Sequence, residues 1–146
     1  MILLDANLLI YAYNEAADQY QVSRRWLKDI LSGIETVCFS WQTIMAFVRV
    51  STNARVFANA YSPAEAFEIV ENWLSAPGTR ILLPTERHIG ILKKVAIDSQ
   101  ISGPMLMDAH LAALAIEHGA TLATTDRDFR RFDGLHIIYP LSTFKK

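Results

Sequence analysis

Residues 106–129 read Leu-Met-Asp-Ala-His-Leu-Ala-Ala-Leu-Ala-Ile-Glu-His-Gly-Ala-Thr-Leu-Ala-Thr-Thr-Asp-Arg-Asp-Phe, and this stretch decides the fold. The run of alanine and leucine up to residue 116 predicts a helix, because both residue types favour helices. Gly119 is placed to end that helix, and residues 120–124 are short and apolar enough for a buried strand. Asp126 and Asp128 follow the strand at once.

This order of helix, glycine, strand and acid has a geometric consequence for Asp108, which lies in the first turn of the predicted helix. A helix that feeds a parallel strand runs antiparallel to it, so the helix begins beside the carboxyl end of the strand. Asp108 and Asp126 are therefore expected at the same edge of the sheet. Open α/β proteins bind their ligands at this edge.

The rest of the chain repeats the alternation of short apolar strands with amphipathic helices. Further strands are predicted at residues 2–4, 35–39, 80–83 and 135–139, and further helices at residues 6–11, 19–32, 40–50, 62–74, 86–98 and 129–132. Continuous apolar strands of this kind belong to a parallel sheet that helices cover on both faces. We therefore predict an α/β fold, a three-layer α/β/α sandwich with four or five mainly parallel strands.

Length and composition limit the function classes. The 146 residues suggest one domain spanning 1–146, and no apolar run approaches the roughly 20 residues that cross a bilayer. The first residues lack the basic region of a signal peptide and the chain has one cysteine, so we expect a cytoplasmic protein. The net charge of −1 provides no general field that attracts nucleic acid. A nucleic-acid substrate would have to be held by a local patch and a metal ion.

Four aspartates from three separate segments are predicted to meet at the carboxyl edge. Asp5 ends the first strand, and it joins Asp108, Asp126 and Asp128 there. Each acid alone has an ordinary explanation, as a helix cap, a first-turn acid or a solvated charge. Together they would repel one another and be costly to desolvate. A hard divalent cation relieves this, and carboxylates suit Mg²⁺ or Mn²⁺ rather than zinc.

Such an ion activates water and stabilises charge on a phosphate, so metal-assisted hydrolysis of a phosphodiester is the predicted reaction. Asn7 is a candidate to orient a water molecule or the Asp5 carboxylate, and Thr124 to hydrogen-bond an acid or a phosphate. Arg127 and Arg130 adjoin the acids. For these arginines the sequence leaves two interpretations open, solvated charges or phosphate contacts.

The chain resembles the PIN-domain ribonucleases of the VapC toxin type over nearly its whole length. Five motifs carry the resemblance, namely Leu3-Leu-Asp-Ala-Asn7, Ser40-Trp-Gln-Thr43, Phe47-Val-Arg-Val-Ser-Thr-Asn53, Asp108-Ala-His-Leu-Ala-Ala-Leu-Ala115 and Thr124-Thr-Asp-Arg-Asp-Phe129. The resemblance implies a metal-dependent endoribonuclease toxin that uses Mg²⁺ or Mn²⁺ on an RNA substrate. It also implies a homodimer and neutralisation by a cognate VapB-type antitoxin.

The resemblance also assigns roles to six residues. The metal-binding acids of the family match Asp5, Asp108 and Asp126, a frequent auxiliary acid matches Asp128, and small supporting polar residues match Asn7 and Thr124. These positions are the predicted catalytic site.

One position departs from the family pattern. Many members have a glutamate three residues before the arginine that is Arg49 here, and this chain has Ala46. We interpret the alanine as the mark of a subgroup. Two alternatives stay open: a catalytically weakened protein that acts mainly as a binding partner, and a phosphatase-like α/β enzyme. The second would want another aspartate two residues after Asp5, where Asn7 stands.

Overall fold

The structure is a computed structural model that describes residues 1–142. Its strands, in chain order, are β1 (Ile2–Leu4), β2 (Val37–Phe39), β3 (Arg80–Ile81), β4 (Thr121–Ala123) and β5 (Ile137–Ile138). They form one sheet in the order β3-β2-β1-β4-β5, and every pairing in it is parallel. The prediction of a mainly parallel sheet is confirmed.

Six α-helices and two 3₁₀ segments connect these strands within the described residues. They are α1 (Ala6–Tyr13), α2 (Tyr20–Leu31), α3 (Trp41–Ser51), α4 (Pro63–Ser75), α5 (His88–Asp98), η1 (Gly103–Met105), α6 (Leu106–His118) and η2 (Arg127–Arg131). None of these helices is both long and apolar enough to cross a membrane.

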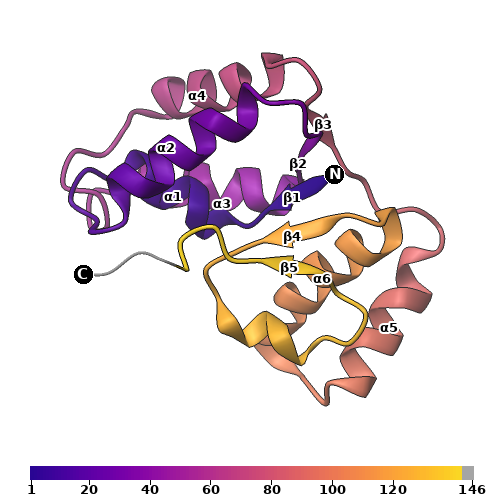
Figure 1. The fold of residues 1–146 in the computed structure, drawn as a ribbon. Helices are drawn as coiled ribbons and strands as arrows, with labels where there is room; N and C mark the ends of the chain where they lie inside the picture. Colours follow the sequence, from indigo (N-terminus) through magenta and orange to yellow (C-terminus); the bar gives the residue numbers. More distant parts are fainter. Residues whose placement is uncertain (143–146) are drawn as a thin grey trace.

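Two hydrophobic cores lie on opposite faces of the sheet. Successive residues of a strand point to opposite faces, and β1 shows this because Leu4 joins one core and Leu3 the other. The Leu4 core packs against α1 to α4, and the Leu3 core packs against α5 and α6. Figure 1 shows these two helical layers on either side of the strands. The predicted three-layer α/β/α sandwich is confirmed.

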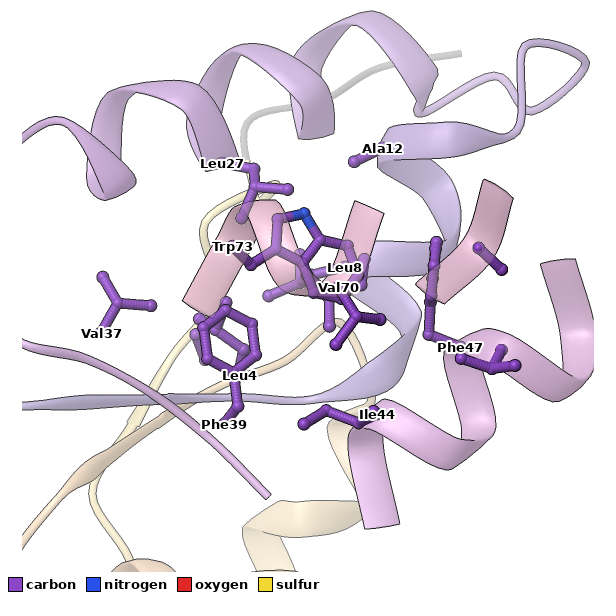
Figure 2. Packing of buried hydrophobic residues seen from close by; sticks show 14 of the residues in the cluster. Leu4, Leu8, Ala12, Leu27, Val37, Phe39, Ile44, Phe47, Val70 and Trp73 are labelled. Carbon is purple, nitrogen blue, oxygen red and sulfur yellow. The ribbon is translucent and has the colours of Figure 1, made fainter. Parts of the chain in front are cut away.

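Trp73 of α4 lies at the centre of the first core (Figure 2). Its ring stacks on Phe39 with centroids 5.5 Å apart, and meets the edge of Phe47 at 4.6 Å. Its indole N–H donates a hydrogen bond to the hydroxyl of Tyr13 over 3.0 Å. The buried polar atom is thus paired, as a buried indole requires. The aromatic cluster joins α1, α3 and α4 to the end of β2.

β1 has the predicted bounds and the other four strands are shorter than the sequence predicts, whereas the helix starts are close to prediction. Ser40 and Ser62 cap α3 and α4, and Glu65 completes a capping box with Ser62. These local hydrogen bonds need only residues three apart, so sequence reveals them. The predicted helix at residues 129–132 is instead the 3₁₀ segment η2, which starts two residues earlier.

A candidate metal centre at the carboxyl edge

The ends of β1 and β4 place Asp5 and Thr124 side by side. The two strands pair in parallel, and the backbone N–H of Asp5 donates to the carbonyl of Ala123 over 2.9 Å. One carboxylate oxygen of Asp5 accepts from the N–H of Ala6 at 2.8 Å, which caps α1. The other accepts from the hydroxyl of the fully buried Thr124 at 2.6 Å.

Thr124 also contacts the second acidic segment. Its hydroxyl oxygen accepts a hydrogen bond from the backbone N–H of Asp126 over 3.0 Å. The Asp126 carboxylate in turn accepts from the N–H of Asp128 over 2.8 Å, and so caps η2. A single hydroxyl therefore links the carboxylate after β1 to the loop after β4.

Asp108 lies in the first turn of α6, where the helix begins beside that loop. Burial raises the pKa of Asp108, and the negative charges of Asp126, Asp5 and Asp128 raise it further, while Arg131 opposes them. Burial also raises the pKa of Asp5, against the hydrogen bonds from Thr124 and Ala6, and the charge of Asp126 adds to the rise. The acids thus share one anionic edge.

These carboxylates are not arranged as a complete set of metal ligands. Among residues 1–142, no three histidine, cysteine, aspartate or glutamate side chains are grouped so that they could hold a metal ion. The donor chemistry nevertheless fits a hard cation, because carboxylates that raise one another's pKa are stabilised by added positive charge. The fold gathers the predicted acids at one edge, while their role as ligands stays a prediction.

Asn7 and Ala46 flank this edge from α1 and α3. Asn7 is exposed in the first turn of α1, close in sequence to Asp5. Ala46 is half-buried in a groove lined by Gln42, Met45, Ala46, Arg49 and Met107. The Gln42 side-chain amide donates to the carbonyl of Met107 over 3.2 Å, so α3 contacts the start of α6 directly beside Asp108.

The family profile of the PIN domain matches residues 2–135 of this chain. The chain belongs to the PIN-domain family. Ribonuclease VapC37 of Mycobacterium tuberculosis is 39% identical over 135 residues, which cover 92% of this chain and 94% of that protein. Ribonuclease VapC43 of the same organism is 36% identical over 141 residues, covering 97% and 96%. The expected membership in the VapC-type PIN proteins is confirmed.

Solved structures agree on the PIN fold. VapBC2 from Rickettsia felis, solved with a DNA fragment from its promoter, matches with a TM-score of 0.69 at 22% identity. The match covers 94% of this chain and 98% of that one. VapC20 of Mycobacterium tuberculosis, a toxin that cleaves the sarcin-ricin loop, matches with a TM-score of 0.63 at 14% identity, and the match covers 93% of this chain and 99% of that one.

Two features of this PIN domain are not predicted by its sequence. Thr43 donates its hydroxyl to the carbonyl of Leu4 over 3.0 Å, which fastens α3 beside Asp5. The Ser40-x-x-Thr43 pattern indicates only a helix start, so it does not predict that contact. The second feature is a cluster of the buried Glu117 and His88 with the half-buried His110 between α5 and α6. Nothing in the spacing of those residues predicts their contact.

Proposed function

We propose that this protein is a metal-dependent endoribonuclease toxin that hydrolyses RNA phosphodiester bonds. The observation that carries the proposal is the shared anionic edge, where the Thr124 hydroxyl joins the Asp5 carboxylate to the backbone of Asp126. The charges of these acids also raise the pKa of Asp108 in the first turn of α6. Relatives that are 33–39% identical over nearly the whole chain are named ribonucleases, which supports the activity. We also propose that residues 1–146 act as one nuclease domain.

Asp5, Asp108 and Asp126 are the residues that we propose to hold Mg²⁺ or Mn²⁺, with Asp128 as an auxiliary acid. A bound divalent cation would supply an activated water and stabilise charge on the phosphate. The protein's own part is to position the acids. Thr124 fixes one oxygen of Asp5 by its hydroxyl and receives the N–H of Asp126. We propose that Asn7 orients water from the exposed side of α1.

The proposed partners follow from the relatives. Solved structures with the same fold are toxin–antitoxin complexes, among them VapBC2 from Rickettsia felis and VapBC from Salmonella typhimurium. We therefore propose that a cognate VapB-type antitoxin neutralises this protein. We further propose a homodimer that works in the cytoplasm, where its RNA substrate is found.

An RNA cleavage assay with controlled metal tests the function. The purified protein is incubated with total RNA in Mg²⁺ or Mn²⁺, and a parallel sample contains EDTA. We expect specific fragments only in the presence of metal, and we expect their loss when the cognate antitoxin is added first. Cleavage that persists in EDTA would contradict the metal dependence, and intact RNA under every condition would contradict the nuclease.

Ala46 favours a second candidate, a PIN-fold protein that binds without cleaving. The alanine removes one family carboxylate, and the described residues contain no preassembled group of three ligands. If this candidate is right, the protein should bind the antitoxin or RNA but produce no RNA fragments. A phosphatase-like enzyme would instead release phosphate from a chromogenic monoester, and Asn7 in place of a second aspartate speaks against it.

Thr124→Val tests the hydroxyl that positions Asp5. Valine keeps the shape but removes the donor to Asp5 and the acceptor for Asp126. Loss of a group that orients a ligand costs about 10- to 100-fold in metal affinity or activity, and we expect a fall of that size in kcat/KM and in Mn²⁺ affinity. Thr124→Ser should restore most of both, because it keeps the hydroxyl.

Thr121→Val is the matched control, because Thr121 begins β4, at the end of the strand opposite to Thr124, and no hydrogen bond of the described residues joins its side chain to the acids. We expect this variant to cleave like the wild type. Equal activity in Thr124→Val and Thr121→Val would show that the Thr124 hydroxyl plays no positioning role.

A further inference from the structure

Three arginines follow Asp126 within five residues, and their side chains make two different kinds of contact. Arg131 turns back, since its Nε donates to the Asp128 carbonyl over 3.2 Å and its guanidinium approaches the sulfur of Met105. Arg127 and Arg130 instead stand over the ring of Tyr139, with Cζ atoms 4.4 Å and 5.5 Å from the centroid.

The guanidinium groups of Arg127 and Arg130 are available to a ligand. Both side chains belong to exposed residues, and within residues 1–142 neither guanidinium has a carboxylate partner or a hydrogen bond. Stacking on Tyr139 restricts them without using their N–H donors. A guanidinium that is held in place loses less entropy when it binds a phosphate, and its planar fork matches the phosphate oxygens.

The sheet order places this pair beside the acids. β4 lies between β1 and β5, so the carboxyl ends of the three strands are neighbours. Asp5 follows β1, Asp126 follows β4, and Tyr139 follows β5 directly. Figure 1 shows the segment after β4 and the chain after β5 on the side where these strands end. The two arginines therefore lie in the segment after β4 that also carries Asp126, and they rest on the residue that follows the neighbouring strand β5.

The charge of the site explains why cations are needed there. Four aspartates repel a phosphate backbone, and a chain of net charge −1 provides no long-range attraction. A metal ion neutralises the acids only locally. Any nucleic acid that reaches them must gain local phosphate contacts, which dominate its affinity.

We propose that Arg127 and Arg130, held on the ring of Tyr139, form a clamp that binds phosphates of the RNA strand next to the cleaved bond. The proposal rests on the proposed ribonuclease function and adds to it the residues that hold the substrate backbone. Phosphate contacts do not depend on base sequence. The clamp can therefore be tested without knowing the natural RNA.

The test measures binding of a fluorescent, mixed-sequence 20-nucleotide RNA by anisotropy, in EDTA, over a range of KCl concentrations. The double variant R127Q/R130Q is compared with the wild type. Each lost phosphate contact makes the negative slope of log K against log salt shallower by about 0.7 for a single strand. Two lost contacts therefore predict a slope that is less negative by about 1.4, and an affinity lower by roughly 25-fold at 0.1 M salt.

The matched control is R25Q/K28Q, which removes two positive charges from exposed positions on α2. We expect it to keep the wild-type slope, because these residues lie on a different element. Tyr139→Leu removes the platform but keeps both arginines, so we expect an intermediate loss. Tyr139→Phe keeps the ring and should bind like the wild type. Melting temperatures confirm that each variant is folded.

The outcomes separate the clamp from the nuclease. If the wild type cleaves RNA with metal but R127Q/R130Q keeps its affinity and salt slope, the clamp is overturned and the nuclease stands. If the wild type never cleaves RNA but its binding depends on the two arginines, the clamp stands and the nuclease fails. Equal losses of RNA affinity in R127Q/R130Q and R25Q/K28Q would show that the effect comes from net charge alone, and would overturn the clamp.

Discussion

Asp108→Asn is expected to lower the rate of RNA cleavage by roughly 10³-fold, because a catalytic metal supplies several kcal/mol of charge stabilisation. Asp5→Asn and Asp126→Asn should lose comparable activity. Asparagine keeps the size of each side chain, and its amide oxygen still accepts the capping N–H of Ala6 or Asp128. Asp108→Asn and Asp126→Asn therefore remove charge and ligand strength rather than local structure, whereas Asp5→Asn also replaces the oxygen that accepts the Thr124 hydroxyl. Initial cleavage rates in saturating Mg²⁺ measure the effect.

Metal affinity gives a second, independent measure of the same three variants. Calorimetric titration of Mn²⁺ should show weaker binding in each of them than in the wild type. Asp29→Asn is the control, because Asp29 is an exposed acid on α2, a helix that carries none of the proposed ligands. An affinity that is unchanged in Asp5→Asn and Asp126→Asn would remove these two residues from the proposed ligand set.

Thermal stability distinguishes a lost ligand from a damaged fold. Burial raises the pKa of Asp5 and Asp108 above 3.8, so above the raised pKa their ionised forms destabilise the metal-free protein. In EDTA at neutral pH, Asp108→Asn should therefore melt no lower than the wild type. Its advantage should vanish as the pH falls below 3.8, because the wild-type Asp108 is then neutral in both states. An inactive variant that melts lower than the wild type would indicate misfolding.

Glu117→Ala is expected to lower the free energy of unfolding by about 3 kcal/mol, because it leaves buried polar partners unpaired. The Glu117 side chain is inaccessible to solvent. One of its oxygens accepts the N–H of Thr85 at 2.7 Å and also the Thr85 hydroxyl, and the other lies 2.8 Å from Nδ1 of His88. The second ring nitrogen of His88 lies 2.9 Å from Nδ1 of His110.

Hydrogen bonds therefore stabilise the ionised form of the Glu117 carboxylate. Burial by itself would raise the pKa of Glu117, but the hydrogen bonds from Thr85 and His88 outweigh it and leave the pKa lowered. The cluster joins the N-terminus of α5 to the middle and end of α6, the helix whose first turn carries Asp108. Loss of the carboxylate should loosen the contact between these two helices.

Urea unfolding measures the Glu117 effect, and a loss of that size corresponds to a melting temperature lower by about 6–12 °C. Glu86→Ala is the control, since Glu86 is exposed and substitutions at such positions stay within about 0.5 kcal/mol. Glu117→Gln should fall between the two, because it keeps one acceptor. A Glu117→Ala protein as stable as Glu86→Ala would show that the cluster does not stabilise the fold.

Much of this architecture follows from local sequence. Short apolar runs that alternate with helices led to the parallel sandwich, and the pattern from Ser62 to Glu65 gave a helix start that the capping box confirms. The positions of Asp5 and Asp126 at strand ends follow from the same alternation. His88 shows what local sequence does not predict. Its place at a helix start does not indicate that it is only 8% exposed and hydrogen-bonded to Glu117.

The sequence by itself determined which residues lie at the ends of strands, because hydrophobic periodicity and capping depend on neighbours within a few positions. Only the tertiary structure decided which of those ends are adjacent. Thr124 reaches Asp5 across 119 residues, and Tyr139 supports Arg127, since β4 inserts between β1 and β5. Strand order is set by the packing of whole helices on both faces of the sheet, and no local pattern encodes it.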